Sequence, residues 1–160
     1  MRGIITLCGS TSFLKEFNKV SLELTLSDYI VLSVGAFLHS DDDLKDRITD
    51  KDKERLDVLH KEKIAMSQSV VILNKNGYVG QSTTSEILYA ISLRKDIYWL
   101  ESDKIPERLI GALYLPQYRP AHDWKELLSK SVVYANSHDS FVVVNTESQG
   151  VINTINWDRL

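Results

Sequence analysis

Apolar residues in the first two thirds of the chain form short continuous runs that alternate with amphipathic segments. The apolar runs predict strands over residues 4–8, 29–34, 69–73 and 96–100. Between them, apolar residues recur at helical spacing and predict helices over residues 13–27, 52–67 and 83–93. Strands that are buried on both faces of a parallel sheet read as continuous apolar runs. The pattern therefore predicts an α/β fold with a Rossmann-like, doubly wound parallel sheet.

The last third of the chain has a different pattern. Pro106, Pro116 and Pro120 interrupt it, and residues 124–128 predict a short helix. Apolar stretches at 140–145 and 151–157 flank a turn-rich loop, which is typical of a β-hairpin. We therefore expect a small C-terminal α+β appendage over residues 103–160, packed on a first domain over residues 1–102.

Composition argues against nucleic-acid polymers and membranes as partners of this protein. The chain has 160 residues and a net charge of −3, with no basic stripe of the kind that nucleic-acid polymers bind. It has neither an apolar run long enough for a membrane span nor a signal peptide, so we expect a cytoplasmic protein with no membrane partner. Cys8 is the single cysteine and reads as a buried strand residue. The four histidines lack metal-site spacing, so no metal and no cofactor are expected.

Three loops are placed to bind a ligand. In open parallel sheets, ligands bind beyond the carboxyl ends of the strands. The loop after the first strand holds Gly9, Ser10 and Thr11 directly before a helix. Backbone N–H groups there can hold a phosphate or carboxylate, although the same residues also fit a plain turn and helix cap. The other two loops cover residues 34–37 and 76–83.

The third loop leads to Glu86. Gly77 and Gly80 allow close approach of the backbone to a ligand, and Ser82 is expected to cap the next helix, with Glu86 in its first turn. A carboxylate in a first turn complements the helix dipole, which is one interpretation. The other is that Glu86 lies at the mouth of the sheet and captures the anomeric carbon of a sugar, as glycosidase nucleophiles do.

Four sequence blocks, in order, resemble the nucleoside 2-deoxyribosyltransferase-like superfamily, and most closely an uncharacterised bacterial and phage branch of it. The blocks are residues 7–13, 31–35, 56–64 and 77–87, and the resemblance covers about residues 1–101. It implies that Glu86 is the nucleophile. The superfamily's upstream helix supplies an aspartate, but the matching position here falls near Lys61. Ala65 also stands where the branch tends to have an aspartate.

The general acid therefore comes from neighbouring residues in this interpretation. Asp57 and Glu62 are the nearby carboxylates, and His60, whose side chain can carry a proton near neutral pH, lies beside the expected position. We expect Glu86, His60 and Asp57 to be catalytic. The expected substrate-binding residues come from the three loops and the strand ends before them: Cys8, Gly9, Ser10, Thr11, Phe13, Gly35, Phe37, Gly77, Gly80, Ser82 and Thr83.

The function expected from the resemblance is cleavage or transfer at the N-glycosidic bond of a (deoxy)nucleoside or nucleoside 5′-monophosphate, through a glycosyl-enzyme. A non-catalytic nucleotide-binding module and an NAD-type glycohydrolase are the alternatives. We also expect a homo-oligomer, because related folds complete their sites across subunits. The aromatic residues Trp124, Tyr134, Phe141 and Trp157 could fill such an interface or pack against their own sheet.

Overall fold

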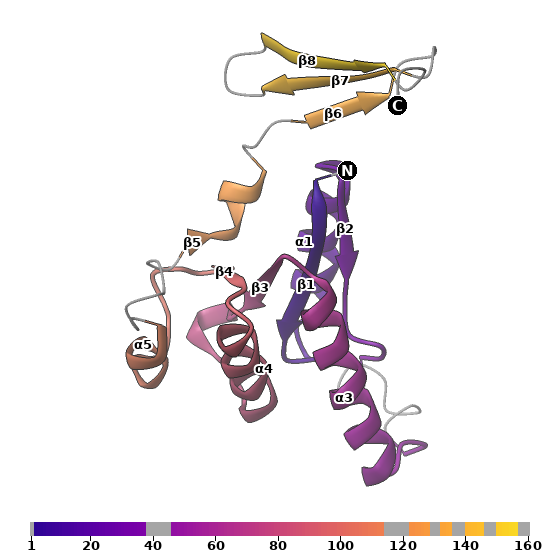
Figure 1. Ribbon diagram of the computed structural model, residues 1–160. Helices are drawn as coiled ribbons and strands as arrows, with labels where there is room; N and C mark the ends of the chain where they lie inside the picture. Colours follow the sequence, from indigo (N-terminus) through magenta and orange to yellow (C-terminus); the bar gives the residue numbers. More distant parts are fainter. Residues whose placement is uncertain are drawn as a thin grey trace.

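The computed structural model contains a five-stranded sheet in which every neighbouring pair is parallel (Figure 1). It describes residues 2–37, 46–113 and 122–128 with their side chains, and the backbone of 132–135, 140–145 and 150–156. The strand order is β2-β1-β3-β4-β5. The strands are β1 (Gly3–Gly9), β2 (Tyr29–Leu32), β3 (Ser69–Leu73), β4 (Asp96–Trp99) and β5 (His122–Asp123). The predicted α/β, doubly wound class is confirmed.

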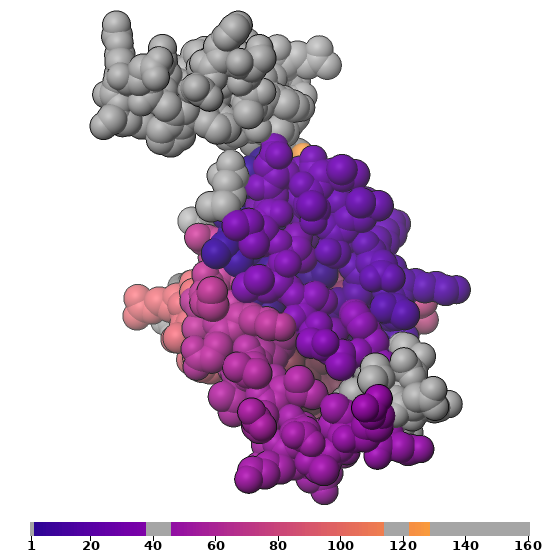
Figure 2. Space-filling model, turned by 90° about the vertical axis from the view of Figure 1, so that its right-hand side faces the viewer, coloured from indigo at the N-terminus to yellow at the C-terminus, as the bar shows by residue number. Residues whose placement is uncertain are grey.

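Helices cover both faces of this sheet. They are α1 (Leu14–Leu26), α3 (Asp50–Met66), α4 (Gln81–Ser92) and α5 (Glu107–Leu113), with short 3-10 turns η1 (Lys75–Gly77) and η2 (Trp124–Leu127). Side chains of β1 point alternately to the two faces. Ile5 and Leu7 pack in a core with α1 and η2, whereas Cys8 packs in a second core with α3, α4 and α5. Figure 2 shows the side of the molecule formed mostly by the first half of the chain.

The strand order creates a binding position between β1 and β3. From β1 the chain passes through α1 to β2 on one side, and β3 lies on the other side of β1. Gly9 at the end of β1 pairs with Leu73 at the end of β3, so the two carboxyl ends meet at one edge. In sheets of this order, ligands bind at that point because the chain leaves the two strands in opposite directions.

The parallel sheet continues past residue 102. α5 and β5 were not expected, yet β5 pairs with β4, and Leu109 and Leu113 of α5 are buried. Trp124 is 1% exposed in the core beside Leu127. The expected division after residue 102 therefore falls inside the packed α/β unit, and Trp124 packs against its own sheet rather than offering interface surface.

The remaining strands form a separate antiparallel sheet in the order β6-β7-β8. They are β6 (Val132–Ala135), β7 (Ser140–Asn145) and β8 (Gly150–Asn156). The expected hairpin is present as the β7–β8 pair, with an irregular register between Val143 and Val144. Tyr134, Phe141 and Trp157 lie outside the residues with described side chains, so the homo-oligomer stays a prediction. Within the described chain, no helix has the length and apolar character to cross a membrane.

Candidate functional site

A cavity of about 460 Å³ opens at the carboxyl edge of the sheet, beside β1 and β3. Loops after β1, β2 and β3, one face of α3 and the start of α4 form its wall. The lining residues are Gly9, Ser10, Thr11, Val34, Gly35, Ala36, Lys53, Leu56, Asp57, His60, Tyr78, Gly80, Gln81, Ser82, Thr83 and Glu86.

One face of α3 supplies four of these residues. Lys53, Leu56, Asp57 and His60 are spaced i, i+3, i+4 and i+7, which places them on one side of a helix. The side chain of Lys61, where the expected acid position falls, is not part of the cavity wall. The sequence spacing on α3 therefore selects Asp57 and His60 as the groups that reach the site.

Two hydrogen bonds fix α3 over the sheet near His60. The hydroxyl of Thr6 in β1 donates to the carbonyl of Lys63 over 2.9 Å. The Lys63 ammonium donates to the carbonyl of Ser33 after β2 over 2.6 Å. Because β1, β2 and α3 are tied together at this point, the His60 ring is held above the end of β1 by rigid elements.

The start of α4 differs from the expectation. The N-cap is Gly80 rather than Ser82, the helix begins at Gln81, and no acidic residue lies in its first turn. Glu86 is thus the sixth residue of α4, in the second turn. Since the dipole effect falls off within the first turn, complementing the dipole is a weak reason for a carboxylate at this position. Its burial and its place in the cavity wall need another explanation.

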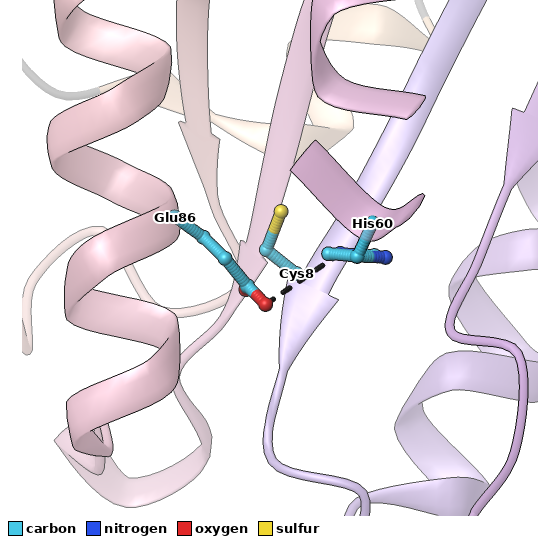
Figure 3. A group of neighbouring side chains, drawn as sticks. All are labelled: Cys8, His60 and Glu86. Carbon is cyan, nitrogen blue, oxygen red and sulfur yellow. Dashed lines mark ion pairs between the residues drawn. The ribbon is translucent and has the colours of Figure 1, made fainter. Parts of the chain in front are cut away.

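Glu86, His60 and Cys8 converge from three different elements. In Figure 3, the side chains of Glu86 from α4 and His60 from α3 approach each other over the end of β1, where Cys8 lies. The Glu86 Oε1 and His60 Nε2 atoms are 3.8 Å apart. The exposed fractions are 0% for Cys8, 6% for His60 and 8% for Glu86. The three polar groups share one desolvated corner at the floor of the cavity.

Burial controls the protonation of all three groups. Burial, followed by the nearby Asp57 charge, raises the pKa of Glu86 to about 7, against smaller opposing effects of Cys8 and Lys61. Burial lowers the pKa of His60 to about 4, with Lys63 acting in the same direction. Burial, followed by the Glu86 charge, raises the pKa of the Cys8 thiol. At neutral pH, His60 is therefore neutral and Glu86 is close to its midpoint.

The loop before α4 is held by a buried amide. The side chain of Asn74 is 0% exposed, donates to the carbonyls of Glu101 and Lys104, and accepts from the Glu101 N–H. Gly77 has a φ of +76°, and a Cβ there would lie 3.1 Å from the Lys104 carbonyl oxygen. Gly77 therefore shapes this loop and is not part of the cavity wall.

Most of the expected site residues meet at the cavity. The catalytic candidates Glu86, His60 and Asp57 line it, as do the binding candidates Gly9, Ser10, Thr11, Gly35, Gly80, Ser82 and Thr83. Cys8 lies beneath it, next to Glu86. Phe37 packs edge-on against Phe17 at a centroid distance of 5.1 Å, and Phe13 packs against Tyr78 at 6.0 Å. These two expected binding residues act in packing instead of lining the cavity.

Sequence reasoning missed several members of the wall. The wall residues absent from the expected set are Val34, Ala36, Lys53, Leu56, Tyr78 and Gln81. Lys53 and Leu56 share the helical spacing of Asp57 and His60, so that spacing was the signal that could have found them. Tyr78 lies between Gly77 and Gly80 in the expected ligand loop and is 57% exposed.

No protein-family model matches this chain, and no curated protein matches it either.

Proposed function

We propose that this protein cleaves or transfers the N-glycosidic bond of a (deoxy)nucleoside or its 5′-monophosphate, with Glu86 as the nucleophile. The observation that carries the proposal is the buried Glu86 carboxylate in the wall of a 460 Å³ cavity at the β1–β3 edge. Small-molecule sites have volumes of about 300–1,000 Å³. The cavity is therefore large enough for a nucleoside, and the resemblance of the sequence to deoxyribosyltransferases favours that substrate class.

The wall is suited to a sugar. Ser10, Thr11, Ser82 and Thr83 supply hydroxyls, and Gly9 and Gly80 belong to the same wall as Glu86. Hydroxyl and N–H groups pair with the hydroxyls of a sugar and with phosphate oxygens. Tyr78, which is exposed at the rim, offers a ring on which a flat base can stack.

The proposed reaction has two displacements. An ionised Glu86 oxygen attacks C1′, the C1′–N bond breaks, and its electron pair leaves with the base, which takes up a proton. The Glu86–C1′ ester is then attacked by water, which gives hydrolysis, or by a second base, which gives transfer. The second step returns the carboxylate, so that no group of the protein is consumed.

Two residues of α3 are placed to assist the departing base. His60 is neutral at pH 7, because burial lowers its pKa to about 4, and a neutral ring supports the base through an N–H hydrogen bond. Asp57 lies one turn earlier on the same cavity face and is exposed, so it can exchange protons with solvent. We assign Asp57, whose negative charge raises the pKa of Glu86, to passing a proton from solvent to the departing base, and His60 to orientation of the base and of Glu86.

A substrate panel tests the proposal. The full-length protein is incubated with purine and pyrimidine nucleosides, deoxynucleosides and their 5′-monophosphates, and free base is measured by chromatography. The proposal expects base release from at least one substrate and, in the quenched reaction, protein whose mass is increased by one sugar. A second free base in the mixture separates transfer from hydrolysis. Tight binding of a nucleotide without any base release would instead show a binding module.

A further inference from the structure

The corner beneath the cavity contains a set of metal-ligand atoms. Cys8 Sγ, a ring nitrogen of His60 and a carboxylate oxygen of Glu86 all lie within 4.8 Å of one another. They come from β1, α3 and α4, which are packed elements of the fold (Figure 3). Within the part of the chain that the structure describes, no other group of three such residues has this geometry.

These atoms also lack the partners that buried polar groups usually have. Among the described residues, neither ring nitrogen of His60 nor the Oε2 atom of Glu86 has a hydrogen-bond partner of good geometry, although the Leu7 backbone and the Cys8 thiol lie close enough to act on the pKa values of His60 and Glu86. The side chains of His60 and Glu86 are 7% and 11% exposed and point into the same corner. Native structures satisfy most buried polar atoms with protein groups, water or a bound ligand, so this polar corner is able to hold one. A cation can accept a lone pair from one ring nitrogen of His60 and from a Glu86 oxygen, while the other ring nitrogen keeps its proton.

The type of ligand atom selects the metal. A thiolate and an imidazole favour zinc over magnesium or calcium, which prefer oxygen ligands. Zinc bonds of about 2.0–2.3 Å in a tetrahedral site place ligand atoms about 3.3–3.8 Å apart. His60 Nε2 and Glu86 Oε1 are already 3.8 Å apart. The other separations are within 4.8 Å, so binding requires the ligand atoms to approach one another by about 1 Å.

The site also has an open position. Catalytic and exchangeable zinc ions use three protein ligands and leave the fourth position to water. His60 and Glu86 line the cavity, so the fourth position faces it and the cavity provides the entry path. Binding releases to solvent the thiol proton of Cys8 and, where Glu86 is protonated, its carboxyl proton, and the resulting thiolate and carboxylate balance the two charges of the ion.

We propose that Cys8, His60 and Glu86 bind one zinc ion, and that zinc and the substrate sugar compete for the Glu86 carboxylate. The second half of this statement rests on the proposed function, whereas the binding itself does not. A Glu86 carboxylate that coordinates zinc is a weaker nucleophile toward C1′, because it shares its negative charge with the ion. Zinc thereby holds the protein in an inactive form, which substrate or a chelator reverses.

Metal binding is tested first, on full-length protein stripped with a chelator. Zinc is titrated against a chromophoric chelator, and cobalt(II) is added separately to report on thiolate coordination through its sulfur-to-metal absorption band. We expect one ion per chain and a sulfur-to-cobalt band. Cys8→Ser should remove the band and weaken zinc binding by at least about tenfold. Glu86→Gln and His60→Asn should weaken it similarly, and they cover the case in which Cys8→Ser does not fold.

His122→Asn is the matched control, because His122 lies outside the cluster and pairs with Glu126. This variant should bind zinc and cobalt as the unchanged protein does. Failure of the folded, unsubstituted protein to bind micromolar zinc would overturn the proposal. So would a cobalt spectrum without the sulfur band, or a zinc affinity in the three cluster variants equal to that of the unchanged protein.

Competition is measured separately, on whichever substrate releases base. Stoichiometric zinc should abolish base release, and a chelator should restore it. Undiminished base release with zinc bound would overturn the competition. Zinc binding in a protein that releases no base from any substrate would overturn the proposed function and leave the metal site standing, so the two failures are distinguishable.

Discussion

The Glu86 carboxylate lies 3.8 Å from Nε2 of His60, with both side chains buried at the carboxyl edge of the parallel sheet. Burial moves the pKa values of these neighbours in opposite directions, to about 7 for Glu86 and about 4 for His60. The pair is therefore mostly uncharged just below neutral pH. Ionising the buried Glu86 carboxyl, which the proposed reaction requires, therefore lowers the free energy of unfolding.

The first prediction concerns stability and pH in metal-free protein. Glu86 keeps its proton up to about pH 7 in the folded state but loses it near pH 4.5 in the unfolded state. The free energy of unfolding therefore falls as pH rises from 4.5 to 7. His60 is neutral when folded and protonated when unfolded between pH 4 and 6.5, so stability falls there as pH falls. Each group changes the free energy of unfolding by about 3 kcal/mol across its own pH range. The two pH dependences have opposite signs and nearly cancel.

Substituting one of the two residues separates the pH dependences of stability that Glu86 and His60 cause. Urea denaturation of Glu86→Gln should show stability rising with pH between 4 and 6.5, because only the His60 effect remains. His60→Gln should show stability falling with pH between 4.5 and 7. Parallel pH dependences in the two variants would show that the opposed shifts do not exist.

The second prediction concerns rate and pH. If ionised Glu86 attacks C1′, base release by metal-free protein should rise about tenfold per pH unit below 7 and level off above it. Asp57 raises the pKa of Glu86 and Lys61 lowers it. Asp57→Asn should therefore shift this limb to lower pH, and Lys61→Ala should shift it to higher pH. Shifts in the same direction in both variants would contradict the assignment of the limb to Glu86.

The order of the main elements is readable from sequence because their apolar runs are long. The predicted strand over residues 69–73 matches β3, and the other early elements differ by a few residues. The structure adds α5 and β5, and the two residues of β5 are too few to show any periodicity. The N-cap of α4 was misassigned because serine is a preferred cap, whereas the turn here begins with Gly80.

The site was only partly predictable for a related reason. The loops that line the cavity follow from the rule about strand ends, and Glu86 follows from its place after one of them. That His60 and Cys8 meet Glu86 depends on how α3 crosses β1, which no local spacing encodes. The 3.8 Å contact between His60 and Glu86 is a product of tertiary packing.

The third prediction concerns the close packing at the end of β1. A Cβ on Gly9 would lie 2.9 Å from the Leu73 Cβ in the paired strand β3, so the two central strands would have to separate. Gly9→Ala should lose about 1–3 kcal/mol of stability in urea denaturation. Gly35→Ala is the control, because its nearest neighbour is a methyl group of Leu56 at 3.5 Å. Equal midpoints for the two variants would contradict this account.

The fourth prediction concerns a 5′-phosphate. The loop from Gly9 to Thr11 precedes α1 in the cavity wall, and Lys53 supplies a positive charge to the same cavity. Monophosphates should bind more tightly than nucleosides by about 1–3 kcal/mol, measured by calorimetry on the Glu86→Gln variant so that no turnover occurs. Lys53→Ala should reduce this difference, and Lys51→Ala, whose side chain is not in the wall, should not. Equal affinities for CMP and cytidine, and for the other pairs, would remove the phosphate site.

The fifth prediction tests the central claim most directly, by comparing base release between the unchanged protein and Glu86→Gln. The substitution keeps the shape of the side chain but removes its anionic oxygen, so that no ester to C1′ can form. On the best substrate of the panel, at pH 8 in the presence of a chelator, the account predicts a fall in kcat of at least about 10²-fold, or about 3 kcal/mol of barrier. It also predicts that the sugar adduct disappears from the intact-protein mass. A folded Glu86→Gln protein that releases base at a near-normal rate would contradict it.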